Sequence, residues 1–293
     1  MRSERAAGDG AGMTLRLLSS PEEYRAVEEV QREAWGLGGD GPVPATIQRA
    51  IQDNGGILLG AFDKDRMVGF TLGFLGREEG RLYHYSHMTG VRPPYQNRSV
   101  GFALKVRQRA EALAQGLDEI RWTFDPLQSR NAFFNIHRLG GTPDRYYPRY
   151  YGTMRDALNE GLETDRLRLV WRLKDPRVEA RLAGECPTSE EDEKRVREST
   201  PLVETALGDQ GLRRPAHVRP PEADRVHLEI PPDLHAVRTR DPGVTRRWRD
   251  VTREAFLQAF AHQYRVDDFV TVRLGGERRS FYLCSRAERT DGA

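Results

Sequence analysis

The stretch from residue 82 to residue 113 constrains the fold of this 293-residue chain more than any other part of the sequence. Leu82–Val91 is rich in Tyr, His and β-branched residues, which is typical of a strand. Pro93 and Pro94 end that strand, because proline cannot donate a hydrogen bond to a sheet. Helical spacing follows in the apolar residues Val100, Leu104, Val106, Ala110 and Leu113. The sequence therefore predicts a strand, a short loop and a helix in direct succession.

The loop between this strand and this helix is polar and carries one cation, Arg98. A helix N-terminus leaves its first amides without intrahelical partners and carries partial positive charge, so it attracts phosphate. Arg98 would add a full charge, and we expect the Ser99 hydroxyl to cap the helix. An ordinary strand-to-helix connection with a serine cap explains the same spacing.

The run Gln96-Asn97-Arg98-Ser99-Val100-Gly101 resembles the Gln/Arg-x-x-Gly-x-Gly/Ala loop of the GNAT superfamily of CoA-dependent N-acyltransferases. The resemblance implies that the amides of Gln96, Asn97, Arg98, Ser99, Val100 and Gly101 hold the CoA pyrophosphate. It departs from the family at Ser99, where glycine is usual. The dinucleotide fingerprint Gly-x-Gly-x-x-Gly and a Walker lysine are both absent.

The order of predicted elements also resembles GNAT proteins. A strand at 14–18, helices after Ser20-Pro21 and around Ile47–Ile51, a hairpin of 56–62 with 67–75, and the 82–91 strand precede the loop and helix. A strand at 119–125, a helix at 131–139 and a strand at 167–173 follow. The implied class is α/β (α+β), with a mixed, mostly antiparallel sheet flanked by helices.

The resemblance implies roles for further residues. The pantetheine arm would lie where the 119–125 strand diverges from the 82–91 strand, and backbone amides of Thr89, Gly90 and Val91 would polarise the thioester carbonyl. Asn131 matches an Asn common in the family at the next helix start. Ile136 stands where the family often has a tyrosine, so a proton donor must come from elsewhere.

Four tyrosines crowd the segment that follows: Tyr146, Tyr147, Tyr150 and Tyr151. A phenol can protonate a leaving thiolate, because both groups titrate above pH 7. Tyr151, with Tyr150 beside it, is our candidate proton donor. Aromatic packing between strands is the alternative for each of the four.

Histidine supplies the candidate base. His84 and His87 lie three apart on a predicted strand, so their side chains point to opposite faces, a poor geometry for a metal. We expect no metal. His84 or His87, whichever faces the divergence of the two strands, could deprotonate an ammonium substrate, because the histidine pKa lies near neutrality. His87 is our candidate.

The acceptor side of the site is implied by family position alone. Trp35 and the loop 36–44 fall where GNAT proteins place the acceptor wall. Arg166 could hold a carboxylate of the acyl group or the acceptor, or could form a salt-bridged turn with Asp165.

Composition narrows the class of protein. Hydrophobic residues make up 38% of the chain and the mean hydropathy is −0.70, with no apolar run long enough for a membrane span. The N-terminus lacks the apolar region of a secretory signal, and Cys186 and Cys284 suggest no disulfide framework, so we expect a cytoplasmic protein. A net charge of +2 is too small for a committed nucleic-acid binder.

Four segments are predicted. Residues 1–12 are a disordered tail and residues 13–175 the acyltransferase domain. Residues 176–225 begin with a short helix at 177–183 and continue as a linker or surface-draped segment with little regular structure. Residues 226–293 form a β-α-β-β unit that is too small to be stable alone, so it packs on the first domain or across a homodimer interface.

A second set of residues resembles one little-characterised GNAT branch with an extra C-terminal segment, some of whose members are misannotated as chorismate synthase. The set is Asp125-Pro126-Leu127, Asn131-Ala132, Asn135, Leu139-Gly140, Tyr150-Tyr151-Gly152, Thr164-Asp165-Arg166 and Trp171. Some members are implicated as N-succinyltransferases of amino acids.

The expected function is therefore transfer of an acetyl or succinyl group from acetyl-CoA or succinyl-CoA to the amine of a small molecule. We expect the protein to have no membrane or nucleic-acid partner. Two alternatives stay open. Ser99 and Ile136 favour a non-catalytic CoA-binding protein that regulates or scaffolds. An RNA-modifying acyltransferase would need a basic face.

Overall fold

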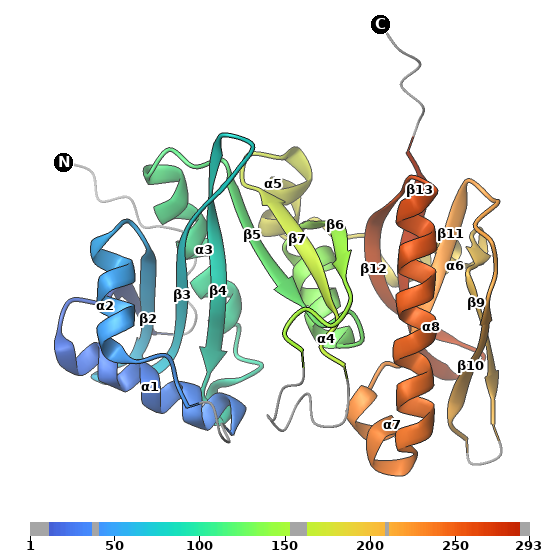
Figure 1. Cartoon of the computed structure of the whole chain (residues 1–293), viewed down its shortest axis with the longest axis horizontal. Helices are drawn as coiled ribbons and strands as arrows, with labels where there is room; N and C mark the ends of the chain where they lie inside the picture. The colour runs from blue at the N-terminus through green and yellow to red at the C-terminus, as the bar shows by residue number, and fades with distance from the viewer. Residues whose placement is uncertain (1–11, 37–40, 153–162, 209–210, 288–293) are drawn as a thin grey trace, which may run out of the picture. The chain divides into compact units, whose positions relative to one another are not determined.

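The computed structural model describes residues 12–36, 41–152, 163–208 and 211–287 (Figure 1). The expected tail, except Gly12, and residues 37–40 of the acceptor loop lie outside this part of the chain. The described residues divide into two compact units. Unit 1 holds residues 12–122, and unit 2 holds residues 123–152 and 163–287. No helix in the described ranges is long and apolar enough to cross a membrane.

Unit 1 follows the predicted order of elements. Its elements are β1 (Thr14–Leu17), α1 (Pro21–Trp35), α2 (Ala45–Asp53), β2 (Ile57–Asp63), β3 (Arg66–Glu78), β4 (Arg81–Val91), the 3₁₀ turn η1 (Pro93–Tyr95), α3 (Val100–Ala114) and β5 (Glu119–Phe124), whose last two residues belong to unit 2. The strand, loop and helix expected between residues 82 and 113 are confirmed.

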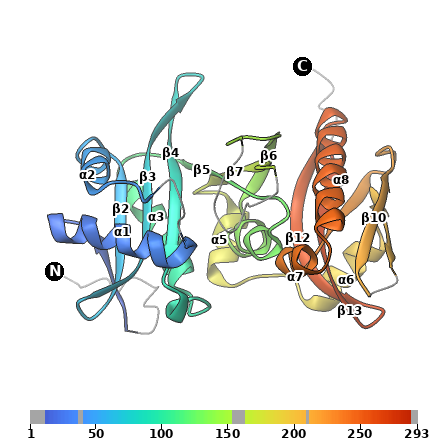
Figure 2. The same cartoon turned by 60° about the horizontal axis from the view of Figure 1, so that its bottom comes forward.

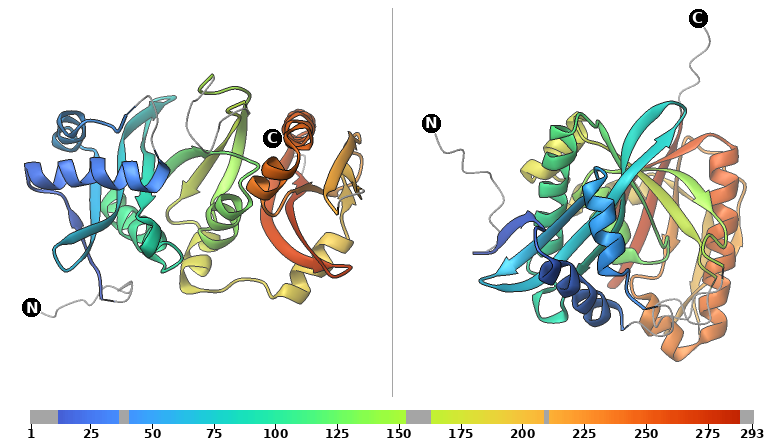
Figure 3. Two further views of the ribbon diagram at one scale, coloured as in Figure 1. Left: turned by 90° about the horizontal axis from the view of Figure 1, so that it is seen from below. Right: turned by 60° about the vertical axis from the view of Figure 1, so that its left-hand side comes forward.

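The sheet of unit 1 runs in the order β1-β2-β3-β4-β5 (Figure 2). Strands β1 to β4 pair antiparallel with one another, and β5 runs parallel to β4. Helices α1 and α2 cover one face and α3 covers the other (Figure 3). Phe70 packs in the α1-side cluster, while the next residue, Thr71, bonds to Gln108 of α3. The expected mixed, mostly antiparallel sheet flanked by helices is therefore confirmed.

Local sequence explains where these elements start and end. Ser20 and Glu23 form a reciprocal capping box at the start of α1, and Gly36 ends that helix in the left-handed conformation. The two-residue turn between β2 and β3 places Lys64 at a φ of 54°.

Unit 2 holds the remaining elements. They are α4 (Ser129–Ala132), the π-helical segment η2 (Phe133–Arg138), β6 (Thr142–Tyr147), β7 (Arg166–Arg172), α5 (Pro176–Ala183), α6 (Ser189–Arg197), β8 (Thr200–Pro201), β9 (Val203–Leu207), β10 (Arg213–Val218), β11 (Arg225–Ile230), α7 (Leu234–Arg240), α8 (Pro242–Ala261), β12 (Tyr264–Leu274) and β13 (Glu277–Arg286). Strands β6 and β7 pair, as do β9 and β10, and a further sheet has the order β12-β13-β11-β8.

The expectation of little regular structure between residues 184 and 225 is wrong. A capping box of Thr188 and Glu191 starts α6, and β9 and β10 form a hairpin. Two of the prolines that suggested a linker lie in edge strands, where proline is tolerated. Pro201 is in the edge strand β8, and Pro215 is in β10, which forms a two-stranded sheet with β9. The division into domains at residue 175 stays a prediction.

Two helices also differ from expectation. The C-terminal segment has a second helix, α7, which Asp233 caps, so its order is β-α-α-β-β. The helix expected at 131–139 begins at Ser129 and becomes π-helical from Phe133. Asn131 is therefore the third residue of α4 and not its first.

The core of unit 2 joins the C-terminal segment to residues near β6. Phe256 of α8 stacks on Tyr146 with ring centroids 5.4 Å apart and meets Tyr282 of β13 at 5.0 Å. The Tyr282 hydroxyl donates to the carbonyl of Pro126 at 2.6 Å. The C-terminal segment therefore shares one core with residues 123–152.

Candidate functional site

The loop between β4 and α3 is exposed and its backbone is unusual. Gln96, Asn97, Arg98 and Ser99 are all exposed, and Asn97 and Ser99 have φ values of 62° and 60°. The expected Ser99 cap is wrong, because its side chain makes no capping hydrogen bond. An N-cap normally adopts an extended backbone, and the left-handed conformation of Ser99 departs from it.

The first amides of α3 are consequently not capped by the loop. Residues in the described ranges provide no hydrogen-bond acceptor to the amides of Val100 and Gly101. A Cβ added at Gly101 would meet nothing within 4 Å, so the surface over this turn is open. A phosphate could approach both amides there.

Side chains brace the loop without using those amides. The Tyr95 hydroxyl donates to Asp63 Oδ2 at 2.9 Å, and Gln96 Nε2 donates to the carbonyl of Val91 at 3.1 Å. The Arg98 guanidinium lies 5.5 Å from the centre of the Tyr95 ring. The loop is therefore held in shape before any ligand binds, with a cation on its exposed side.

Strand β4 contains a bulge just before Thr89. Ser86 pairs with Gly73 and Met88 with Leu72, so His87 is an extra residue. The bulge changes which residues face α3. Before the bulge, the Ser86 side chain contacts α3. After the bulge, Thr89 lies on the α3 face, with its hydroxyl 2.9 Å from the Thr71 hydroxyl.

Trp35 packs against the end of β4. A Cβ at Gly90 would lie 2.8 Å from the Phe70 ring and 3.1 Å from the Trp35 ring, so glycine is needed for this approach. Trp35 and Phe70 themselves form an edge-to-face pair at 5.9 Å. The predicted acceptor residue Trp35 therefore lies beside the predicted cofactor strand.

His87 belongs to an aromatic group on the sheet face away from α3. Its ring is 5.9 Å from Phe74 and 6.3 Å from Tyr85. Although His87 is exposed, the protein around it displaces water and lowers its pKa below the ordinary histidine value. The lowered pKa favours the neutral imidazole, which is the form that can accept a proton.

A buried polar network that sequence reasoning missed lies on the α3 face. Lys105 Nζ donates to Ser86 Oγ at 2.7 Å and to Gln108 Oε1 at 3.2 Å, and stands 4.0 Å from the centre of the Trp122 ring. Gln108 Nε2 contacts Thr71 Oγ1 and His84 Nε2, each at 3.1 Å.

The amine of this network, Lys105, has no carboxylate partner among the described residues. Lys105 is buried, and none of the ion pairs in the described ranges involves it. Burial lowers its pKa to about 7. Burial first and then the charge of Lys105 lower the pKa of His84 to about 3, and His84 Nδ1 has no partner among the described residues. The signal in the sequence was two polar residues, 105 and 108, interrupting an otherwise apolar helix face.

The other predicted residues lie in unit 2. Tyr150 and Tyr151 are 44% and 43% exposed, with ring centroids 4.7 Å apart. The Arg166 guanidinium is 5.1 Å from the centre of the Tyr151 ring and donates to the backbone carbonyl of Asp165 at 3.0 Å. The structure thus brings Tyr150, Tyr151 and Arg166 together. Asn131 is exposed on α4.

Two positions in unit 2 are structural. Tyr146 is buried and donates to Asp165 Oδ2 at 2.7 Å, and burial raises its pKa well above 10. Ile136, at the place where the family often has a tyrosine, is fully buried. Among the described residues no group of three His, Cys, Asp or Glu side chains is arranged to hold a metal.

No family model matches the chain, and no curated protein matches it. Solved structures do resemble it. The ribosomal-protein-S18-alanine N-acetyltransferase of Escherichia coli is 14% identical, with 56% of this chain and 95% of that one aligned at a TM-score of 0.45. A Salmonella typhimurium protein described as an acetyltransferase and solved with acetyl-CoA is 19% identical, with 56% and 95% aligned at 0.46. A GNAT-family acetyltransferase of Streptococcus pneumoniae is 18% identical, with 54% and 98% aligned at 0.43. Over about half of its length, this chain is thus similar to acetyltransferases of known structure.

Proposed function

We propose that this protein is an acyl-CoA-dependent N-acyltransferase of the GNAT type. The observation that carries the proposal is the β4–loop–α3 turn, where an exposed loop with Arg98 leads into α3 and no described residue offers an acceptor to the amides of Val100 and Gly101. A diphosphate is the ligand that such a turn suits best. The loop sequence Gln96–Gly101 and the element order of unit 1 support the same ligand.

Each residue then takes a role by its chemistry. Bound acyl-CoA supplies the thioester carbon. Arg98 and the amides of residues 96–101 hold the diphosphate, and backbone amides of Thr89–Val91 stabilise the oxyanion. His87, in its neutral form, takes a proton from the acceptor ammonium so that the amine can attack. Tyr151 returns a proton to the leaving thiolate.

The substrates follow from the same reasoning. We propose a small-molecule amine, with an amino acid as the first class to test, and an acetyl or succinyl donor. Trp35 would form part of the acceptor wall, Asn131 would contact the cofactor, and Arg166 would meet a carboxylate on the acyl group or acceptor. The wild-type protein should bind CoA in calorimetry and release thiol with succinyl-CoA or acetyl-CoA and an amino-acid panel.

The variant Gly101→Asp tests the diphosphate site directly. An aspartate in the first turn of α3 suits the helix dipole, so the fold should keep its stability. The same charge repels a diphosphate, and we expect CoA affinity to fall at least tenfold in calorimetry. The control Ala110→Asp adds the same charge at an exposed position further along α3 and should bind CoA like the wild type.

Two results would count against this proposal. Equal CoA affinity in Gly101→Asp and the wild type would place the diphosphate elsewhere. Tight CoA binding without thiol release on any amine would favour the non-catalytic alternative.

A further inference from the structure

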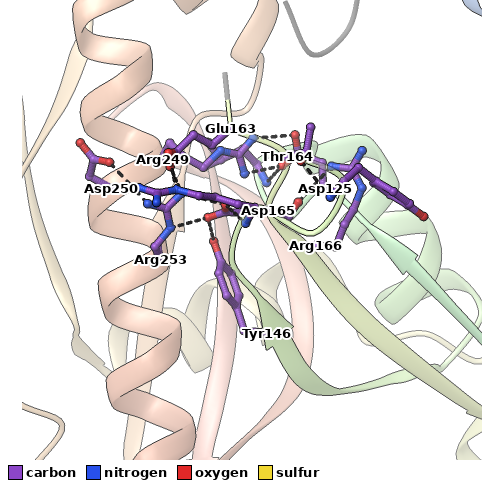
Figure 4. A network of polar contacts seen from close by, with 12 residues as sticks. Asp125, Tyr146, Glu163, Thr164, Asp165, Arg166, Arg249, Asp250 and Arg253 are labelled. Atoms are coloured by element: carbon purple, nitrogen blue, oxygen red, sulfur yellow. Dashed lines mark hydrogen bonds and ion pairs between the residues drawn. The ribbon is translucent and has the colours of Figure 1, made fainter. Parts of the chain in front are cut away.

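One buried carboxylate in unit 2 ties the C-terminal helix α8 to the turn that carries Tyr150 and Tyr151. Asp165 is fully buried just before β7. Arg253 of α8 grips it with two bonds, Nε to Oδ2 at 2.8 Å and Nη2 to Oδ1 at 2.7 Å (Figure 4). The amide of Arg149 donates to Asp165 Oδ1 at 3.0 Å. Asp165 thus connects α8 to the first residue of the turn.

The neighbouring residue, Thr164, fixes the rest of this turn. Its carbonyl accepts from the amide of Tyr150 at 3.1 Å, and its hydroxyl accepts from the amide of Tyr151 at 3.1 Å. The same hydroxyl donates to the carbonyl of Gly152 at 2.7 Å. These bonds therefore fix the backbone that carries the Tyr150 and Tyr151 side chains, and both rings remain accessible.

The turn needs external support because its backbone is strained. Arg149 has a φ of 50°, which a side chain other than glycine rarely adopts. Its side chain bonds to Glu163 at 2.5 Å, and Glu163 also forms an ion pair with Arg253. Arg253 therefore contacts both carboxylates that hold Arg149.

A second arginine anchors α8 itself. Arg249 is buried one helical turn before Arg253 and binds Asp125 with two bonds of 2.8 and 2.7 Å. Asp125 directly follows β5. Paired guanidinium–carboxylate bonds have fixed geometry, so α8 cannot shift along its axis without breaking both pairs.

We propose that Arg253, on a helix of the C-terminal segment, is a positioning residue for acyl transfer, acting through Asp165 and Thr164 on Tyr151. Arg249 holds the helix from which Arg253 acts. This inference rests on the proposed function, in which Tyr151 donates the proton to the thiolate.

Kinetics of Arg253→Met, with Arg246→Met as the matched control, test the inference. Arg246 is an exposed arginine of the same helix. We expect kcat to fall at least tenfold in Arg253→Met with CoA affinity within twofold of wild type, and no change in Arg246→Met. Tyr151→Phe should lower kcat at least tenfold when it is made in the wild type. Made in the Arg253→Met variant, it should lower kcat less than threefold, because both substitutions act on the same step.

Hydrogen exchange separates this inference from the proposed function, because it needs no activity. Arg253→Met should speed exchange at the amides of Arg149, Tyr150 and Tyr151 at least tenfold more than it speeds exchange in β11–β13. Unchanged exchange at the turn, a uniform rise across unit 2, or additive effects of the two substitutions would overturn the inference. Arg253→Lys, which keeps the charge and loses the paired bonds, replaces Arg253→Met if that variant does not fold. An inactive wild type with the expected exchange pattern would defeat the proposed function alone.

Discussion

Single residues in unit 1 take conformations and environments that their types do not favour. Ser99 is the clearest case, because its φ of 60° is a glycine conformation and its hydroxyl makes no cap bond. The family loop that residues 96–101 resemble usually has glycine there, a residue that adopts a positive φ without strain. A serine at this position retains the turn at a cost in free energy.

Replacing Ser99 by glycine should therefore stabilise the protein. We expect the free energy of unfolding in urea to rise by about 0.5–1 kcal/mol, because the left-handed strain is relieved and no capping bond is lost. The contrasting variant Ala110→Gly, inside the same helix, should lower it by about 1 kcal/mol. A loss of stability in Ser99→Gly would mean that the hydroxyl has a role that its contacts do not reveal.

Lys105 makes stability depend on pH. Its pKa is about 7 in the folded protein, against 10.5 for an ordinary lysine such as that of the unfolded chain. Between pH 7 and pH 10.5 the unfolded chain therefore binds the proton more tightly than the folded protein does. The free energy of unfolding should accordingly rise between pH 7.5 and 9, by at most about 1.4 kcal/mol per pH unit from this group. His84 titrates well below this range, with a pKa of about 3.

Urea titrations at each pH measure this slope. Lys105→Met should remove most of it, and the exposed Lys194→Met should keep it. A slope that survives in Lys105→Met would show that other groups produce it.

At the scale of elements, the sequence predicts those with strong periodicity and loses those held by distant contacts. The β2–β3 hairpin, β4, α3 and β12–β13 follow alternating or helical patterns and stand where expected. Strands β9 and β10 carry little apolar pattern. The Trp248 indole of α8 donates to the carbonyl of Arg213 at 3.3 Å and thereby anchors β10. No local pattern announces such a contact.

The candidate site divides in the same way. The loop at 96–101 was predictable, because strand end, prolines and helix start are adjacent in sequence. The role of Arg253 was not, because its partner Asp165 lies 88 residues earlier. On α3, the apolar pattern predicted the buried face only in part. Ala110 is exposed, whereas Lys105 and Gln108 are buried.

For the whole molecule, the question is whether residues 13–175 can form a domain without the C-terminal segment. Within unit 2 the answer depends on buried charges. Asp125 and Asp165 take their guanidinium partners from Arg249 and Arg253, and removing one partner of a buried pair costs about 3–5 kcal/mol. The stacking of Phe256 on Tyr146 would be lost as well.

A fragment ending at residue 175 should therefore leave β6 and β7 without stable protection. We expect their amides, at 142–147 and 166–172, to exchange at least a hundredfold faster than in the full chain, and co-expressed 176–293 to restore them. A chain ending at residue 287 keeps α8 and should behave like the full protein. Native protection of β6 and β7 in the 1–175 fragment would instead support the sequence-based boundary at 175. That result would mean that residues 13–175 fold without the arginines of α8, and that Asp125 and Asp165 either bind other partners in the fragment or become protonated.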